Sequence, residues 1–319
     1  MFSRLREKTD GFTVTPEQFT KIAFVGVLML TLIVATGSAV RLSNSGLGCP
    51  DWPRCYGKAY PPADLHSIVE FGNRVLSGLV TLGVFAAAFA AMRRRPYRRD
   101  LTLLAWCLPL GALIQAVLGA LSVESELQYE WVMAHFTGSM IIAIAGVALI
   151  WRSMHEPGSR PRSEDRLAVW SIRGLLVMTA AAWISGMATT AAGPHAGGDP
   201  GSVARWEPRG GDSLEWVVHR HGRVADVLGI LAVLVWLLLW RRGASRELRL
   251  NSTIFVVLLG IQGLIGSIQW NQQLPAELVW LHVVFGTLCW ISALWFTCVA
   301  GRIEPRPENA RATLAPEQA

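Results

Sequence analysis

The chain has 319 residues, of which 52% are hydrophobic and only 16% are charged, and its formal net charge is +6. Average globular domains carry about 25% charged residues, so the composition excludes a disordered chain, a secreted protein and a soluble α/β enzyme. A bilayer-spanning helix needs about 20 predominantly apolar residues. Eight stretches meet this requirement: 20–41, 70–92, 101–122, 131–151, 167–192, 216–240, 251–270 and 277–300. We therefore predict an all-α polytopic membrane protein with eight transmembrane helices in the lipid bilayer.

The lysine and arginine residues are distributed unequally between the loops on the two sides. If the N-terminus is cytoplasmic, nineteen of them fall in the cytoplasmic segments Met1–Pro16, Arg93–Asp100, Arg152–Arg166, Arg241–Arg249 and the tail after Gly301. The opposite side holds four, namely Arg54, Lys58, Arg205 and Arg209. This positive-inside pattern predicts a cell-membrane protein with both termini in the cytoplasm. Because the positive charges follow the loops, they do not indicate a nucleic-acid partner.

The chain contains an internal repeat. In the third apolar stretch QAVLG begins at Gln115, and His135 follows twenty residues later in the fourth stretch. In the seventh stretch QGLIG begins at Gln262, and His282 again follows after twenty residues in the eighth. Repeats with an even number of spans are parallel, so we expect two related four-helix bundles.

The repeat divides the chain into segments with predicted bounds. These are a cytoplasmic N-terminal segment at 1–19, a first bundle at 20–152 with an external cysteine-containing loop at 42–69, a cytoplasmic linker at 153–166, a second bundle at 167–300 and a cytoplasmic tail at 301–319. The tail is rich in proline, glutamate and alanine, and this composition is typical of disorder.

The second half carries a pair of histidines suited to a heme iron. His221 in the sixth stretch and His282 in the eighth are expected on facing helices of one bundle, and neutral imidazole nitrogen is a common heme ligand. His219 is a fallback for His221, since it lies two residues away and points about 200° round the helix. Arg220 and Arg223 are candidates for charge-assisted hydrogen bonds to heme propionates.

The first half has one histidine where the second has two. Asn73 aligns with His221, because an arginine follows each of them after twenty residues, so His135 has no histidine partner. The second stretch offers Glu70, Asn73 and Arg74 instead, which favours a place where a macrocycle docks for chemistry. A carboxylate in a low dielectric can act as an acid or a base near neutral pH, so Glu70 is the candidate catalytic residue. The alternative is an N-terminal charge favoured by the helix dipole.

Two of the five cysteines lie in the first external loop. Cys49 and Cys55 flank PDWPR, and two cysteines six residues apart on a proline-rich turn outside the cytoplasmic membrane can form a disulfide. Such a pair is either a structural staple or a redox-active thiol pair. The other three cysteines lie inside apolar stretches, where a free thiol is usually a small core residue.

Four motifs carry a family resemblance. They are TGSAVR at 36–41, SGLGCPDWPRC at 45–55, EFGNR at 70–74 and GPHAG at 193–197. Together with histidines 135, 221 and 282 in the expected stretches, they make the chain resemble the heme A synthase family over residues 20–300. The cysteine loop followed by a glutamate-containing second span is the most specific part of the match.

The resemblance implies an eight-span enzyme that oxidises the C8 methyl group of heme O to a formyl group, giving heme A for cytochrome c oxidase. By position it implies heme b on His221 and His282, and a substrate heme that His135 ligates or orients. It implies Glu70 at the catalytic site, where it stabilises a cationic intermediate or moves protons. It also implies a disulfide between Cys49 and Cys55 that assists heme transfer or electron movement.

The chain departs from the family pattern at one position, and the resemblance also implies partners. Several members carry a histidine three residues after the glutamate, where this chain has Asn73, which puts double histidine ligation of the substrate heme in doubt. A heme O synthase, the protoheme farnesyltransferase, is the implied donor of heme O. The reaction removes four electrons and heme b accepts one at a time, so an outside electron acceptor is required. The sequence leaves the identity of that acceptor and homo-oligomer formation open.

Two other classes of protein fit parts of the pattern. A b-type cytochrome that only relays electrons would be expected to have a histidine pair in both halves and has no use for Glu70. A transporter would fit the parallel repeats, but its substrate path usually needs broken helices near the membrane midplane. His195, in the loop between the fifth and sixth stretches, is a further candidate ligand in the second half.

Overall fold

The computed structural model describes residues 12–157, 159, 161–195 and 205–303. Eight long helices account for most of them: α1 (Pro16–Leu42), α2 (Leu65–Arg93), α3 (Arg99–Glu124), α4 (Tyr129–Ser153), α5 (Arg166–Ala192), α6 (Ser213–Arg241), α7 (Arg246–Asn271) and α8 (Ala276–Ala300). All eight are long and apolar enough to cross a membrane. The predicted all-α polytopic membrane fold is therefore confirmed. Most of the tail predicted to be disordered, from residue 304 on, lies outside the described residues.

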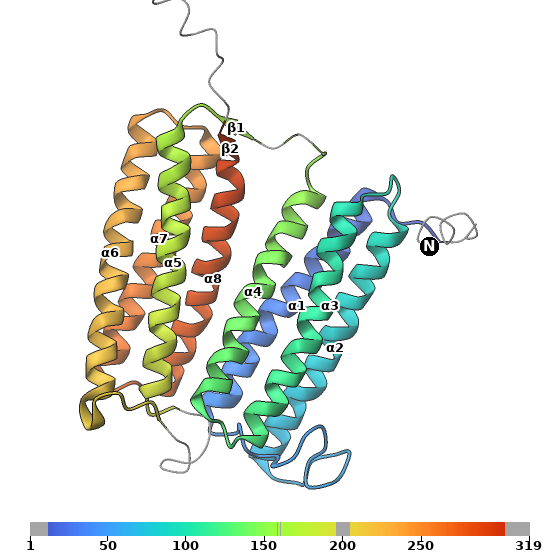
Figure 1. Cartoon of the computed structure of the whole chain (residues 1–319), viewed down its shortest axis with the longest axis vertical. Helices are drawn as coiled ribbons and strands as arrows, with labels where there is room; N and C mark the ends of the chain where they lie inside the picture. The colour runs from blue at the N-terminus through green and yellow to red at the C-terminus, as the bar shows by residue number, and fades with distance from the viewer. Residues whose placement is uncertain (1–11, 158, 160, 196–204, 304–319) are drawn as a thin grey trace, which may run out of the picture.

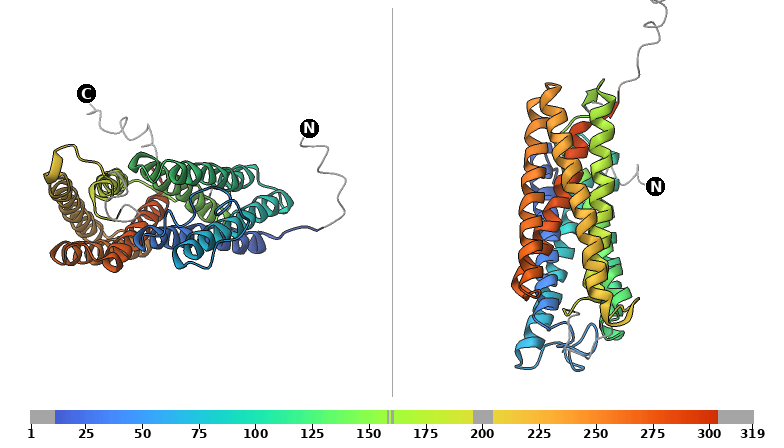
Figure 2. Two further views of the ribbon diagram at one scale, coloured as in Figure 1. Left: turned by 90° about the horizontal axis from the view of Figure 1, so that it is seen from below. Right: turned by 90° about the vertical axis from the view of Figure 1, so that its left-hand side faces the viewer.

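The helices form two four-helix groups that stand side by side (Figure 1; Figure 2, left). In the first group α1 contacts α2 and α4, and α3 contacts the same two helices. In the second group α5 contacts α6 and α8, and α7 likewise contacts α6 and α8. Hence α2 and α4 occupy opposite corners of one group, and α6 and α8 occupy opposite corners of the other. Side chains at those corners that point inward meet near the bundle axis.

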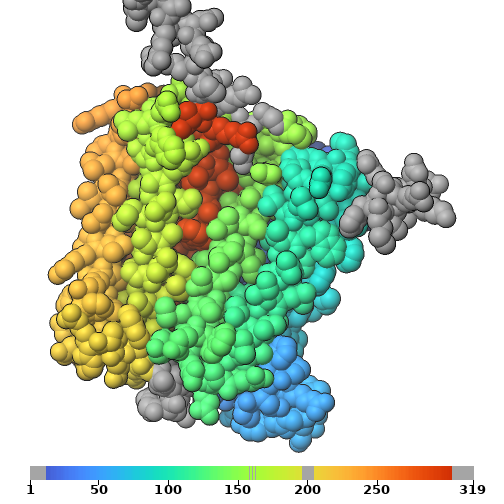
Figure 3. Space-filling model, in the orientation of Figure 1, coloured from blue at the N-terminus to red at the C-terminus, as the bar shows by residue number. Residues whose placement is uncertain are grey.

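Tryptophans help to join the two groups. Trp290 on α8 donates its indole N–H to the backbone carbonyl of Met140 on α4 at 3.1 Å, and Trp280 donates to the carbonyl of Ala35 on α1 at 2.9 Å. Both indoles thereby satisfy their one polar group inside an apolar contact. In the space-filling view, α4, α5 and α8 form a continuous surface between the two groups (Figure 3).

Local signals explain where the helices begin. Thr15 and Gln18 form a reciprocal capping box ahead of α1, with Pro16 at its first position. The side chain of Asp64 accepts the backbone N–H of Ser67, which starts α2 at Leu65. The loop between the first two helices therefore spans 43–64, which is shorter than the predicted 42–69 at its C-terminal end.

The two ends of the molecule differ. At the end where α1 begins and α8 stops, strand β1 (Arg162–Ser163) pairs in parallel with β2 (Arg302–Ile303). The opposite end carries the cysteine loop and a short 3₁₀ helix, η1 (Gly210–Asp212). Because the eight helices alternate in direction, the start of α1 and the last residue of α8 lie at the same end of the molecule.

One tight turn occurs twice, before α4 and before α8. Glu126 and Leu127 have φ values of 56° and 61°, and Gln273 and Leu274 have φ values of 62° and 63°. Non-glycine residues adopt this left-handed conformation rarely, and it costs about 1 kcal/mol or more per residue. In each turn the leucine, which is the second of the two residues, donates its N–H to the carbonyl five residues earlier. These bonds measure 2.8 Å for Leu127 and 2.7 Å for Leu274. The repeat seen in the sequence thus extends to backbone conformation.

Candidate functional site

Two imidazoles meet across the second bundle. His221 on α6 and His282 on α8 have ring centroids 6.2 Å apart and ring planes at 84°. Glycines face both rings: a Cβ on Gly186 would lie 3.2 Å from Cε1 of His221, and one on Gly266 would lie 3.0 Å from Cε1 of His282. Larger residues at these glycines would push the rings out of place.

The hydroxyl of Ser185 on α5 contacts the ring of His221. This hydroxyl donates to the carbonyl of Ala182 at 2.8 Å, so its oxygen is left to accept. Nδ1 of His221 lies 3.0 Å from this oxygen, a contact in which a protonated Nδ1 can act as the donor. In that form Nε2 carries the free lone pair, which is the form that a metal needs.

The pair fits a heme iron. A metal–imidazole bond is about 2.0–2.1 Å, so the 6.2 Å between the two ring centroids leaves space for one metal atom between the imidazoles. Nδ1 of His282 is buried without a side-chain hydrogen-bond partner among the described residues. The described part of the chain holds no group of three or more His, Cys, Asp or Glu residues placed to bind a metal ion. Two ligands suit heme because the macrocycle supplies the other four nitrogens.

The fallback ligand and the two arginines predicted to contact propionates lie at the surface of α6. The side chain of His219 is 57% exposed and its Nδ1 lies 4.0 Å from the carboxylate of Glu215. Arg220 and Arg223 are exposed as well. The guanidinium of Arg220 stacks on the ring of Trp216 at 3.7 Å from its centroid. His219 therefore points away from His282, whereas His221 points toward it.

The first bundle places His135 on α4 and Asn73 on α2 at the corresponding corners. Within the described residues, Nδ1 of His135 and Oδ1 of Asn73 are both buried without a side-chain hydrogen-bond partner. Glycines again face both side chains, since an added Cβ on Gly119 would lie 3.6 Å from His135 and one on Gly37 would lie 3.8 Å from Asn73. A groove of about 510 Å³ between α1 and α2 runs beside Asn73.

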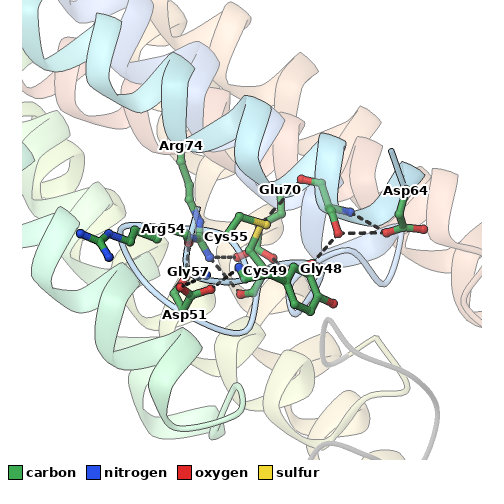
Figure 4. Close-up of a disulfide and its surroundings, with 11 residues drawn as sticks. Gly48, Cys49, Asp51, Arg54, Cys55, Gly57, Asp64, Glu70 and Arg74 are labelled. Carbon is green, nitrogen blue, oxygen red and sulfur yellow. Dashed lines mark hydrogen bonds and ion pairs between the residues drawn. A yellow bond between two sulfur atoms is a disulfide. The ribbon is translucent and has the colours of Figure 1, made fainter. Parts of the chain in front are cut away.

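Glu70 and Arg74 bind the cysteine loop (Figure 4). Glu70 is only 5% exposed, and its two oxygens accept the N–H of Cys49 at 2.7 Å and the guanidinium of Arg74 at 2.5 Å. Arg74 also donates to the backbone carbonyls of Cys49, Asp51 and Arg54 at 3.1, 2.7 and 2.8 Å. Sequence reasoning missed this anchoring because the partners are backbone atoms; the only signal is the i, i+4 spacing of Glu70 and Arg74.

The loop itself is closed by the predicted disulfide, Cys49–Cys55. Both cysteines are fully buried. The carboxylate of Asp51 accepts the backbone N–H groups of Tyr56 and Gly57 at 2.6 and 2.9 Å. Gly48 packs directly on α2, where an added Cβ would lie 2.4 Å from the backbone of His66. The loop is thus a rigid cap over the start of α2.

His195 lies at the junction of the two bundles. Its Nε2 donates to the carbonyl of Leu274 at 2.6 Å, and its own carbonyl accepts a hydrogen bond from Arg41 on α1 at 2.5 Å. Nε2 of His195 is therefore protonated and engaged with the turn before α8, which leaves Nδ1 as the ring nitrogen with the lone pair. The remainder of the GPHAG motif, Ala196–Gly197, lies outside the described residues.

Comparison with known proteins adds independent information. Residues 20–210 match the COX15-CtaA family model, described as cytochrome oxidase assembly protein. A heme A synthase of Halalkalibacterium halodurans is 27% identical over 279 residues, covering 82% of this chain and 92% of the relative. Heme A synthases of Bacillus licheniformis and Bacillus pumilus are 28% and 30% identical over 145 and 148 residues, covering 45% and 46% of this chain. These two alignments span about half the length of the relatives, 48% and 47%.

Proposed function

Because the chain belongs to the family of cytochrome oxidase assembly proteins, we propose that it is a heme A synthase. The enzyme would oxidise the C8 methyl group of heme O to a formyl group and so supply heme A to cytochrome c oxidase. Similarity to a heme A synthase along most of that relative's length supports this assignment. So does the presence of one inward-facing polar pair in each bundle.

The second bundle would hold heme b between His221 and His282. Bound heme b supplies a one-electron acceptor for the oxidation. Ser185 supports this role, because its contact with Nδ1 suits the form in which Nε2 of His221 is unprotonated. Arg220 and Arg223, which are exposed, lie on the same helix within a turn of His221 and would be the partners of the heme propionates.

The first bundle would hold the substrate heme. His135 supplies one strong ligand, whereas an amide such as Asn73 is a poor ligand for iron. Weak ligation suits a molecule that must enter, react and leave. The groove beside Asn73, between α1 and α2, would be the lateral path from the bilayer.

Glu70 is the proposed catalytic residue of this half. Arg74 and the N–H of Cys49 stabilise its ionised form, so it can stabilise positive charge that develops on the substrate methyl carbon. Its Oε2 can accept a proton if the hydrogen bond from Cys49 opens. Either action makes the position of the cysteine loop part of the site.

The orientation and partners follow from the same proposal. Both termini would be cytoplasmic, because the arginine-rich loops lie at the end where α1 begins. The cysteine loop would then be external, where its buried disulfide acts as a structural staple. A heme O synthase would deliver the substrate. A separate electron acceptor, which is not part of this chain, would take four electrons per turnover.

The diagonal pair of His221 and His282 is the observation that carries the proposal, and extraction of hemes tests it. The protein is purified in detergent from cells that supply heme O, and its hemes are separated by chromatography. Heme b with heme O and heme A is expected from the wild type, with heme A lost from Glu70→Ala. Two heme b per chain, with no effect of Glu70→Ala, would instead identify a relay cytochrome.

A further inference from the structure

A glutamine contacts the backbone of the ligand histidine in both bundles. Nε2 of Gln115 on α3 donates to the carbonyl of His135 on α4 at 2.8 Å. Nε2 of Gln262 on α7 donates to the carbonyl of His282 on α8 at 3.0 Å. The carbonyl of a helical residue normally serves only its own helix, so each glutamine ties the histidine to the preceding helix at one height.

The glycine that follows each glutamine after four residues contacts the imidazole itself. Gly119 and Gly266 leave room for Cε1 of their histidines, as described above. Residues four apart lie on one face of a helix. The segment from glutamine to glycine therefore forms one surface that holds the histidine twice, at its carbonyl and at its ring.

The same two kinds of polar atom, a glutamine oxygen and a histidine ring nitrogen, recur in both bundles. Oε1 of Gln115 and Oε1 of Gln262 are buried and have no donor among the residues that the structure describes. Nδ1 of His135 and Nδ1 of His282 are buried and have no side-chain partner there, and each ring lies beside the backbone of its glutamine, Gln115 or Gln262. A histidine that binds iron through Nε2 carries its proton on Nδ1, and metal-bound histidines almost always donate that proton to an acceptor. In each bundle an unused side-chain acceptor thus accompanies an Nδ1 donor that lies beside the backbone of the same glutamine.

The orientation of the Gln115 amide follows from its hydrogen bonds. The hydroxyl of Ser139 donates to the carbonyl of His135 at 3.2 Å and so must accept from Gln115, whose nitrogen lies 2.6 Å away. Nitrogen therefore faces α4 at both contacts, and oxygen is the atom left over. In the second bundle the residue one turn after His282 is Gly286, so Gln262 makes only the contact with the carbonyl.

We propose that Gln115 and Gln262 are positioning residues for the two histidines. The amide N–H fixes the height of the histidine on its helix, and the amide oxygen accepts the Nδ1 proton, directly or through one buried water, when Nε2 binds a heme iron. The inference rests on the proposed function, because it assumes that His135 and His282 bind heme. It assigns a role to the glutamine–histidine repeat itself.

The test compares Gln262→Leu and Gln262→Glu in the purified, heme-loaded protein. Leucine removes donor and acceptor, whereas glutamate removes the donor and strengthens the acceptor. We expect Gln262→Leu to retain heme b about 10- to 100-fold more weakly, as for other residues that support metal ligands. A stronger acceptor makes the imidazole a better electron donor, so the midpoint potential should rise in Gln262→Leu and fall in Gln262→Glu.

Gln269→Leu is the matched control. Gln269 lies on the same helix and also has a buried, unpaired Oε1 within the described part of the chain, but no contact with His282 is found for it. It should leave the potential and the low-spin electron paramagnetic resonance signal of heme b unchanged. An equal shift in this control would attribute the effect to helix packing and would overturn the inference.

The outcomes separate the inference from the function on which it rests. A wild-type protein without a low-spin heme signal would overturn the proposed function. A normal wild-type signal, with unchanged potential and heme retention in both Gln262 variants, would overturn the positioning role alone. If Gln262→Leu fails to accumulate as a folded protein, the midpoint potential of Gln262→Glu tests the positioning role. A fall supports the role, and an unchanged potential overturns it.

Discussion

His221 and His282 face each other across the second bundle with ring centroids 6.2 Å apart. The contact exists because α6 and α8 occupy opposite corners of a four-helix group, so their inward residues meet near its axis. His135 and Asn73 hold the corresponding corners of the first group. The two halves thus share a helix arrangement and differ in one inward-facing residue, Asn73 in place of a histidine.

Replacing His221 should abolish the low-spin heme of the second bundle. In the proposed site, His221→Ala removes one of the two imidazoles that would hold heme b, so the iron would lose one strong ligand and become high-spin. His219→Ala is the matched control, because its exposed ring points away from His282 and its loss should leave the spectrum intact. Absorption and electron paramagnetic resonance spectra of the purified proteins measure the difference. Loss of the low-spin signal in His219→Ala, with the signal kept in His221→Ala, would assign the heme ligand to His219.

Asn73→His should create a second low-spin site. Gly37 leaves space beside residue 73 as Gly186 does beside His221, so an imidazole can be accommodated there. Two strong ligands would hold the substrate heme more tightly, and we expect more heme retained per chain with slower release of product. Asn73→Gln, which adds length but no imidazole, is the control. An unchanged count of low-spin signals would contradict the predicted alignment of Asn73 with His221.

Arg74 should be needed for the position of the cysteine loop. Arg74→Ala leaves the buried carboxylate of Glu70 without its partner, which we expect to cost about 3 kcal/mol in unfolding free energy. Arg74→Lys should restore the ion pair but not the loop, because one ammonium cannot reach carbonyls of three residues. Thermal unfolding reports the first effect and protease sensitivity of the loop reports the second. Full protection of the loop in Arg74→Lys would refute this account.

Loss of the disulfide should lower stability without displacing the helices. The double variant Cys49→Ser, Cys55→Ser removes a cross-link across six residues, and the chain-entropy relation gives about 2 kcal/mol for so short a loop. Cys107→Ser, which changes an exposed free thiol, is the control. If heme A formation ceases while stability is unchanged, the cysteines act as a redox pair instead of a staple.

The start of α2 should contribute a pH-dependent stability through Asp64. Hydrogen bonds from the backbone N–H and the hydroxyl of Ser67 hold the pKa of Asp64 below its ordinary value. A lowered pKa in the folded state stabilises the fold above the unfolded pKa of about 3.9, and this contribution is lost as pH falls through the folded pKa. Unfolding temperatures measured from pH 6 to pH 2 should therefore fall less steeply in Asp64→Asn. Identical acid profiles would exclude this contribution.

The sequence by itself determined the eight membrane helices, because hydropathy is a sum over contiguous residues. It also located the histidines of α4 and α8, since their spacing from a glutamine is repeated along the chain. The family resemblance and the disulfide between Cys49 and Cys55 were likewise predictable, because both depend on short local motifs.

Beyond the expected pair of His221 and His282, only the tertiary structure decided which side chains meet. Helices such as α3 and α8 are apolar on all sides, so no polar pattern marks the face that turns inward. The contact of Ser185 with His221, the clamp of Arg74 on the cysteine loop and the bond from His195 to Leu274 all join residues of different segments. Several of these bonds end on backbone carbonyls, which every residue has. Their position depends on helix rotation and packing, which a linear pattern does not encode.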